Sequence, residues 1–127
     1  MRVLIVDDSA GIRTRLVTLL TEIAGVEVVG QAESVAQAIA ALRELRPDAV
    51  ILDLRLPDGN GLDVLRLIQR EKILTAVIVL TNYPYPQYEE RARAAGAYAF
   101  LSKSRDFVQI AGLLQTLMSG GRQQSQL

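Results

Sequence analysis

The chain has 127 residues, half of them hydrophobic, and its fourteen basic side chains balance fourteen acidic ones. This length fits one domain with a substantial core, and the composition excludes a disordered chain. The even charge balance gives no electrostatic signature of a protein that binds nucleic acid or an anionic membrane. Cysteine and histidine are absent, which excludes disulfides, thiolate chemistry and histidine metal sites. No apolar stretch reaches membrane-spanning length and no signal-peptide pattern begins the chain, so we expect a cytoplasmic protein.

Short apolar runs alternate with segments of helical periodicity five times along the chain. Continuous apolar runs separated by helix-length segments are typical of buried parallel strands with helices on both faces of the sheet. The predicted strands cover residues 2–7, 26–31, 49–53, 76–80 and 98–101. A predicted helix follows each strand, and the fourth helix is a short one over residues 87–95. The pattern therefore predicts a single α/β domain without internal repeats.

Several residues are typical of helix ends. Asp8 or Ser9 is suited to the N-cap of the first helix, and Gly25 to the C′ position that follows it. Ser34 is the predicted N-cap of the second helix, which Pro47 ends. On this interpretation, the acidic residue before the first helix has only a structural role.

Polar side chains follow four of the five predicted strands. Asp7 and Asp8 end the first, Asp53 ends the third, Thr81 is the first residue after the fourth, and Lys103 closely follows the fifth. The carboxyl ends of parallel strands meet at one edge of an open α/β sheet, where ligands bind. Three carboxylates form a hard oxygen-ligand set suited to Mg²⁺, and a lysine ammonium is suited to a carboxylate or phosphoryl oxygen. The sequence therefore predicts a site for a cation and a phosphoryl group.

The ordered set of Asp7-Asp8, Asp53 with the turn-rich segment 54–61, Thr81 and Lys103 resembles a response-regulator receiver domain of two-component signalling. The resemblance covers residues 1–119, and residues 120–127 form a polar tail that we expect to be frayed. It implies a doubly wound, five-stranded parallel sheet, (βα)5, with the flavodoxin-like strand order 2-1-3-4-5. It also implies a signalling domain that phosphorylates and dephosphorylates itself, rather than a turnover enzyme.

The resemblance implies a role for each matching residue. Asp53 is the phosphoacceptor, which receives a phosphoryl group from a sensor histidine kinase or a phosphotransfer protein. Mg²⁺ is the implied cofactor, bound by Asp53, directly by Asp8, mainly through water by Asp7, and by the backbone carbonyl of Arg55. Lys103 and the switch residue Thr81 hold phosphoryl oxygens.

Further expectations concern regulation. Phe100 occupies the family's aromatic switch position, although a plain strand residue is an equal interpretation. Arg55 and Tyr83 occupy the variable positions that set how fast the phosphoryl group is lost. Where the family usually has a proline after the lysine, this chain has Ser104, which suits the N-cap of the last helix with Asp106 in its first turn.

The resemblance places partner binding on the face formed by the fourth helix, the fifth strand and the fifth helix. Tyr83, Tyr85, Tyr88 and Phe100 lie in these segments, and tyrosines are enriched at interfaces. We expect this face to bind a downstream protein or a second copy of the chain, without direct contact to nucleic acid or membrane. The alternative is that Tyr85 and Tyr88 only cover a loop stiffened by Pro84 and Pro86.

Three other functions are alternatives. A small aspartyl-nucleophile phosphatase of the haloacid-dehalogenase type resembles a pattern of two aspartates separated by one residue, which Asp7-Asp8-Ser9 lacks. A nucleotide-binding module needs glycines and backbone N–H groups where the first turn offers acid. The third is the receiver fragment of a larger DNA-binding regulator, although we expect a stand-alone receiver because the chain begins with Met and ends in a polar tail.

Overall fold

The computed structural model describes residues 1–120, so residues 121–127 of the predicted tail over residues 120–127 lie outside this part of the chain. Five parallel strands form one sheet in the order β2-β1-β3-β6-β7. The predicted order 2-1-3-4-5 is confirmed, because β6 and β7 are the fourth and fifth strands of the sheet. The strands are β1 (Arg2–Val6), β2 (Glu27–Ala32), β3 (Ala49–Leu52), β6 (Ala76–Thr81) and β7 (Ala99–Ser102).

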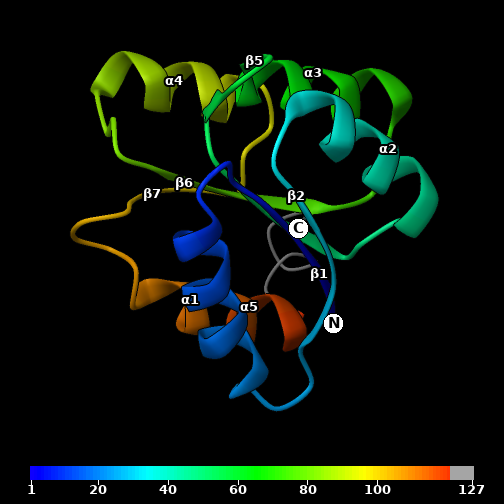
Figure 1. Cartoon of the computed structure of the whole chain (residues 1–127), viewed down its shortest axis with the longest axis vertical. Helices are drawn as coiled ribbons and strands as arrows, with labels where there is room; N and C mark the ends of the chain where they lie inside the picture. The colour runs from blue at the N-terminus through cyan, green and yellow to red at the C-terminus, as the bar shows by residue number, and fades with distance from the viewer. Residues whose placement is uncertain (121–127) are drawn as a thin grey trace.

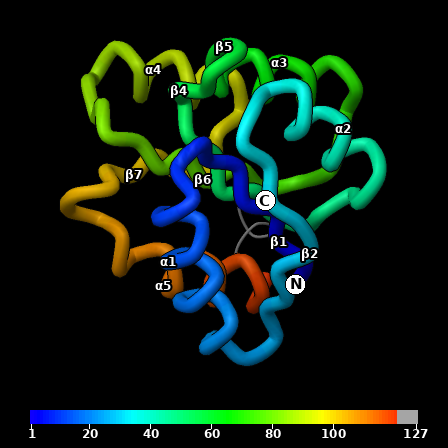
Figure 2. The backbone as a smooth tube through the Cα atoms, viewed as in Figure 1, coloured from blue at the N-terminus to red at the C-terminus, as the bar shows by residue number. Residues whose placement is uncertain are grey.

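Helices cover both faces of the sheet (Figures 1 and 2). Helices α2 (Val35–Leu45), α3 (Gly61–Glu71) and α4 (Pro86–Ala94) pack on one face, and α1 (Ala10–Thr21) and α5 (Gln109–Met118) pack on the other. Successive strand residues point to opposite faces, so each buried strand contributes to both hydrophobic layers. This explains why the strands are continuous apolar runs rather than alternating ones. Among the described residues, no helix is both long and apolar enough to span a membrane.

A short hairpin that the sequence analysis did not predict follows β3. Its strands β4 (Arg55–Leu56) and β5 (Gly59–Asn60) are antiparallel. Asn60 then caps α3, and the side chains of Asn60 and Asp63 form a capping box. The two-residue strands lie within the turn-rich segment 54–61, whose composition favours turns over strands.

The structure corrects several predicted element ends. Gly25 is not the C′ residue of α1, because the helix already ends at Thr21 with Glu22 as its C-cap. Gly25 instead adopts a positive φ of 85° in the turn before β2. Ser104 does not cap the last helix and Asp106 is not in its first turn, since α5 begins at Gln109 and Val108 is its N-cap.

The structure also shows the N-caps of α1 and α2. The hydroxyl of Ser34 accepts the backbone N–H of Gln37 at 3.1 Å, as predicted for α2. For α1 the N-cap is Ser9, whose hydroxyl accepts the N–H of Ile12 at 3.2 Å. Asp8 is therefore not required as a cap.

Gly61 lies where α3 begins against the end of β3. A Cβ atom at this position would lie 2.5 Å from the carbonyl oxygen of Asp53, which is closer than non-bonded atoms approach. We expect Gly61→Ala to lower the free energy of unfolding by about 1–3 kcal/mol, the usual cost of overpacking. Urea denaturation measures this change.

Gly112→Ala is the matched control, because a Cβ at this exposed position of α5 meets nothing within 4 Å. Alanine has the higher helix propensity, so this variant should gain up to about 1 kcal/mol. Equal effects of the two substitutions would contradict the close approach at Gly61.

Candidate functional site

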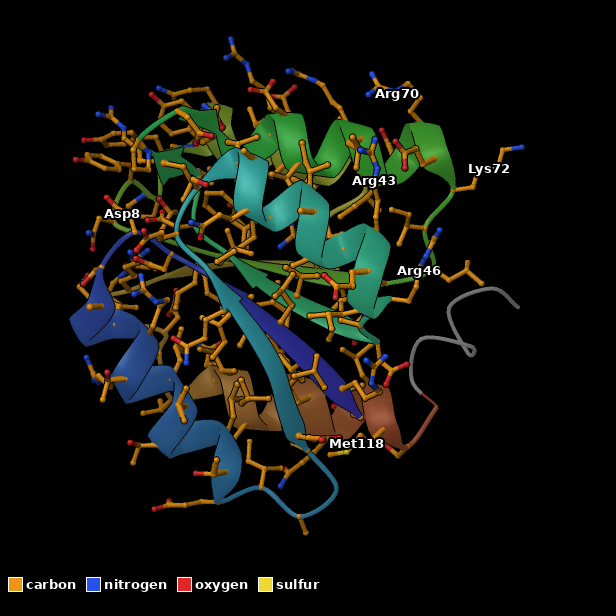
Figure 3. The ribbon with its side chains drawn as sticks, turned by 45° about the vertical axis from the view of Figure 1, so that its right-hand side comes forward. Asp8, Arg43, Arg46, Arg70, Lys72 and Met118 are labelled. Carbon is orange, nitrogen blue, oxygen red and sulfur yellow. The ribbon has the colours of Figure 1, made fainter. Side chains whose placement is uncertain are left out.

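Three carboxylates meet at the carboxyl ends of β1 and β3. Asp7 and Asp53 are buried, with exposed fractions of 2% and 5%, whereas Asp8 is exposed. One carboxylate oxygen from each lies within 4.8 Å of one from each of the other two. In Figure 3 the labelled Asp8 lies at the end of the molecule opposite to the labelled Arg43, Arg46, Arg70 and Lys72. The parallel sheet thus brings the three predicted acidic residues together.

Lys103 joins two of these carboxylates. Its ammonium lies 2.7 Å from Oδ2 of Asp7 and 3.1 Å from Oδ2 of Asp53, and its side chain is almost completely buried. The backbone N–H of Lys103 donates to the carbonyl oxygen of Thr81 at 2.9 Å, which attaches the lysine to the end of β6. One buried cation therefore neutralises part of the charge of two buried anions.

This sharing has different consequences for the two ends of the ion pair. Burial raises the pKa of the Asp53 carboxyl, and the charge of Asp7 raises it further, while the ammonium of Lys103 opposes both effects. Burial alone would lower the pKa of Lys103, but its contacts with Asp7 and Asp53 outweigh burial, so the pKa is raised. Lysine gains two anionic partners, whereas Asp53 has only a share of one cation. The fold therefore favours the charged form of Lys103 but disfavours the ionised form of Asp53.

Backbone N–H groups orient the acidic side chains. The N–H of Ser9 donates to Oδ1 of Asp7 at 2.9 Å, and the N–H of Arg55 donates to Oδ1 of Asp53 at 3.3 Å. The guanidinium of Arg13 donates to the backbone carbonyl of Asp7 at 2.7 Å. The sequence analysis missed Arg13, whose only signal is its position one turn inside the helix that follows the acidic pair.

Thr81 is completely buried and is the last residue of β6, not the first residue after the strand as predicted. Its backbone remains paired with β7 through Ser102, which extends the strand by one residue. Its hydroxyl oxygen accepts the N–H of Tyr83 at 3.0 Å. This contact connects the end of β6 to the segment that leads into α4.

Arg55 and Tyr83 form a stacked pair at the edge of the site. The guanidinium carbon of Arg55 lies 4.1 Å from the centre of the Tyr83 ring, a distance typical of a cation–π interaction. The pair borders a cavity of about 30 Å³, enough for about one water molecule. The cavity is lined by Leu54, Arg55, Asn60, Thr81, Tyr83 and Tyr88.

The aromatic series continues from Tyr83 along the start of α4. The ring centres of Tyr83 and Tyr85 are 6.4 Å apart, and those of Tyr85 and Tyr88 are 5.8 Å apart. Tyr85 is half exposed. Phe100, in contrast, is buried in the layer beneath α3 and α4, because its position on β7 points to that face of the sheet. Phe100 therefore adds no exposed ring to this aromatic series.

The donor set fits a divalent cation. Carboxylate oxygens are the ligands that Mg²⁺ prefers, and the cluster of Asp7, Asp8 and Asp53 carries more negative charge than Lys103 neutralises. The exposed Asp8 leaves one side of the cluster open to solvent, as a cation that retains several waters requires.

The two neighbouring aspartates should respond differently to substitution in chelator. Asp7→Ala removes the acceptor of two close contacts, with Lys103 and with the N–H of Ser9, so we expect a loss of roughly 1–3 kcal/mol in the free energy of unfolding. Asp8→Ala should be neutral or stabilising, because the exposed Asp8 adds to the carboxylate crowding. Urea denaturation compares the two, and a loss for Asp8→Ala as large as that for Asp7→Ala would contradict this assignment.

In the metal-free protein, Asp53→Asn should change how the stability of the fold depends on pH. The raised pKa means that the folded state binds the proton of Asp53 more tightly than the unfolded state, so stability falls as pH rises from about 4 through that pKa. Over this pH range Asp53→Asn should therefore become more stable than wild type. At lower pH the two should be equally stable, because the carboxyl of Asp53 is then protonated and neutral.

Asp58→Asn is a control of opposite sign for this pH profile. The N–H groups of Ala36 and Val35 lower the pKa of Asp58, so that carboxylate stabilises the fold once ionised. Relative to wild type, Asp58→Asn should lose stability as pH rises through the same range. Thermal melts at a series of pH values test both variants, and parallel profiles would contradict the opposite environments of the two carboxylates.

The family model described as the response regulator receiver domain matches residues 3–115. The response regulator GacA from Pseudomonas viridiflava is 31% identical over 122 residues, which cover 96% of this chain and 57% of GacA. The DNA-binding transcriptional activator DevR/DosR from Mycobacterium tuberculosis is 37% identical over 121 residues, which cover 94% of this chain and 55% of the activator. The chain thus spans little more than half the length of these relatives.

A solved structure supports the same assignment. The isolated REC domain of RcsB from Salmonella enterica serovar Typhimurium, in the presence of the phosphomimetic BeF3−, superposes with a TM-score of 0.87 at 26% sequence identity. The match covers 94% of this chain and 89% of that domain. The sequence match, the sheet order and the acidic cluster agree, and the chain belongs to the response-regulator receiver family, whose function is phosphorylation-mediated signalling.

Proposed function

We propose that Asp53 accepts a phosphoryl group from a sensor histidine kinase or a phosphotransfer protein. The observation that carries the proposal is the buried ammonium of Lys103 between Asp7 and Asp53. A carboxylate oxygen of Asp53 attacks phosphorus, so a P–O bond forms while the bond from phosphorus to the donor's imidazole nitrogen breaks and that nitrogen takes a proton. The domain is then a signalling protein that is modified once per cycle, rather than a turnover enzyme.

Lys103 and Thr81 are the proposed partners of the transferred group. The ammonium is already 3.1 Å from Asp53, so it reaches phosphoryl oxygens at that carboxylate with little movement. The Thr81 hydroxyl oxygen accepts the N–H of Tyr83, which leaves its hydrogen to donate to a phosphoryl oxygen. Any shift of Thr81 would be transmitted through this bond to the segment before α4.

The proposed metal ligands are Asp8 directly, Asp7 mainly through water, Asp53, and the backbone carbonyl of Arg55. Their support is the donor set, in which the oxygens of three carboxylates lie within 4.8 Å of one another. When bound, Mg²⁺ supplies positive charge that offsets the negative charge of the phosphoryl oxygens and of the attacking carboxylate. The residues themselves orient the acceptor: Arg55 donates its N–H to Asp53, and Lys103 holds the other oxygen.

We place the partner surface on α4, β7 and α5, with the exposed Tyr85 and the partly buried Tyr88 as its anchors. Pro84 and Pro86 flank Tyr85 and restrict its backbone, which lowers the entropy lost on binding. Phe100 is the proposed second switch residue, and its buried ring packs in the layer that α4 covers. The occupant is a downstream protein or a second copy of this chain.

A second candidate is the receiver half of a longer DNA-binding regulator. The coverage of GacA and DevR/DosR, 57% and 55% of their lengths, favours it. An immunoblot of the native protein distinguishes the candidates. A band near 13.9 kDa supports a stand-alone receiver, and a clearly larger band supports the longer regulator.

The phosphoacceptor is tested with a small acyl phosphate as donor. We expect wild type to gain the mass of one phosphoryl group only when Mg²⁺ is present, and Asp53→Asn to gain none, because the amide is no nucleophile. Intact-mass spectrometry with and without chelator measures this. Asp63→Asn is the control, since Asp63 is an exposed aspartate in the capping box of α3. Equal labelling of Asp53→Asn would refute the assignment.

Arg55 and Tyr83 should slow the loss of the phosphoryl group. Their stacked side chains border the cavity that Thr81 also lines. We propose that they restrict the approach of water to Asp53. We expect Arg55→Ala to shorten the half-life of the phosphorylated form about two- to tenfold, the change that roughly 0.5–1.4 kcal/mol of barrier produces.

Decay of the intact mass after donor removal measures this half-life. Tyr83→Ala should act in the same direction, because it removes the ring on which the guanidinium rests. Arg66→Ala is the control, since Arg66 is an exposed arginine of α3 paired with Asp63. Half-lives that are identical for Arg55→Ala and Arg66→Ala would show that the stack does not cover the site.

A further inference from the structure

The segment that carries Lys103 is held by a set of side-chain hydrogen bonds outside the acidic cluster. The N–H of Ser102 donates to Oδ2 of Asp106, and the N–H of Asp106 donates to the carbonyl oxygen of Ser102, both at 2.9 Å. These two bonds are reciprocal and close a ring around the three residues between them. Lys103 is the first of those residues.

Other polar groups of this ring are also paired. The Ser102 hydroxyl lies 3.0 Å from the Ser104 hydroxyl and accepts the Ser104 N–H at 3.3 Å. The second carboxylate oxygen of Asp106 accepts the side-chain amide of Gln109 at 3.1 Å. Each oxygen of the Asp106 carboxylate therefore has its own donor, which restricts the carboxylate to one orientation.

Both ends of the segment are anchored to the fold. At its start, the N–H of Lys103 donates to the carbonyl of Thr81 on β6. At its end, Phe107 is buried in the layer beneath α1 and α5, with the guanidinium of Arg15 lying 4.0 Å from the ring centre. The ring around Asp106 thus spans the interval between two fixed points.

Capping of α5 does not account for the Asp106 carboxylate. The N-cap of α5 is Val108, which has no side-chain cap hydrogen bond, and the bond from the N–H of Gln109 goes to the backbone carbonyl of Asp106. The carboxylate instead turns back toward Ser102 at the end of β7. Its main-chain partner belongs to the strand that delivers Lys103, not to the helix.

We propose that Asp106, with Ser102 and Ser104, is a positioning residue that aims the ammonium of Lys103 at Asp53. Lysine has a flexible four-carbon stem, so an ammonium that must meet a transferring phosphoryl group benefits from a backbone fixed beforehand. In this chain the hydrogen-bonded ring supplies a restraint at the position where the family usually has a proline and this chain has Ser104. The catalytic consequence rests on the proposed phosphorylation of Asp53, but the effect on Lys103 does not.

The chain contains only two lysines, Lys72 and Lys103, so lysine labelled with ¹³C and ¹⁵N reports on the segment directly. Lys72 is exposed and its side chain points away from the fold (Figure 3), which provides an internal reference for a free ammonium. In the metal-free full chain, we expect Asp106→Ala to shift the side-chain resonances of Lys103 toward those of Lys72. Asp106→Asn keeps an acceptor for Ser102 and should restore most of the wild-type spectrum.

Asp58→Ala is the matched control, because Asp58 also accepts two backbone N–H groups, but at the start of α2. It should leave the Lys103 resonances in place. Ser104→Ala is a milder second variant, for use if Asp106→Ala does not fold, and it should shift the Lys103 resonances in the same direction. Wild-type Lys103 resonances in both folded variants would overturn the proposal.

The functional arm uses the labelling rate with the acyl phosphate. Asp106→Ala should lower the rate about tenfold in wild type and have no further effect in a Lys103→Ala background, while Mg²⁺ affinity stays unchanged. An equal loss in both backgrounds would show that Asp106 acts on general stability and would overturn the proposal. If wild type is not labelled at all, the proposed function fails, and the lysine spectra alone decide whether Asp106 positions Lys103.

Discussion

The shared ammonium of Lys103 is the interaction on which the site depends. Asp7 and Asp53 are both buried, and two carboxylates so close would otherwise repel each other in a poorly solvated environment. Burial and the charge of Asp7 raise the pKa of the Asp53 carboxyl, and the ammonium of Lys103 offsets only part of this effect. The cluster is therefore left with an excess of negative charge, which a bound cation would offset.

The hydrophobic core stabilises the fold that holds these charges together. Two hydrophobic layers flank the sheet, and they hold the ends of β1, β3, β6 and β7 at one edge. Burial of these apolar side chains is the main source of stability. The fold therefore tolerates the repulsion between the carboxylates at its edge. The acidic residues, Thr81 and the lysine lie at or just after the ends of these strands.

Two neighbouring segments connect this edge to the surface. On one side the Thr81 hydroxyl, Tyr83 and Arg55 connect β6 to the hairpin after β3. On the other side Asp106 closes the segment after β7. The two meet at the backbone, where the N–H of Lys103 donates to Thr81. Through Lys103, Asp53 is therefore connected to the segments that lead into α4 and α5.

The sequence by itself determined the parallel sheet, its strand order through the family resemblance, and the gathering of Asp7, Asp8, Asp53 and Lys103 at one edge. Apolar runs and strand-end charges are local signals, and parallel topology converts them into a shared location. Only the tertiary structure decided that Lys103 bridges Asp7 and Asp53, that Arg55 stacks on Tyr83, that Phe100 is buried, and that α5 begins at Gln109. Ser104 shows the reason: its propensity favours a helix cap, but hydrogen bonds with Ser102 hold it in the turn instead. Local propensity is worth about 1 kcal/mol or less, so other hydrogen bonds and packing override it.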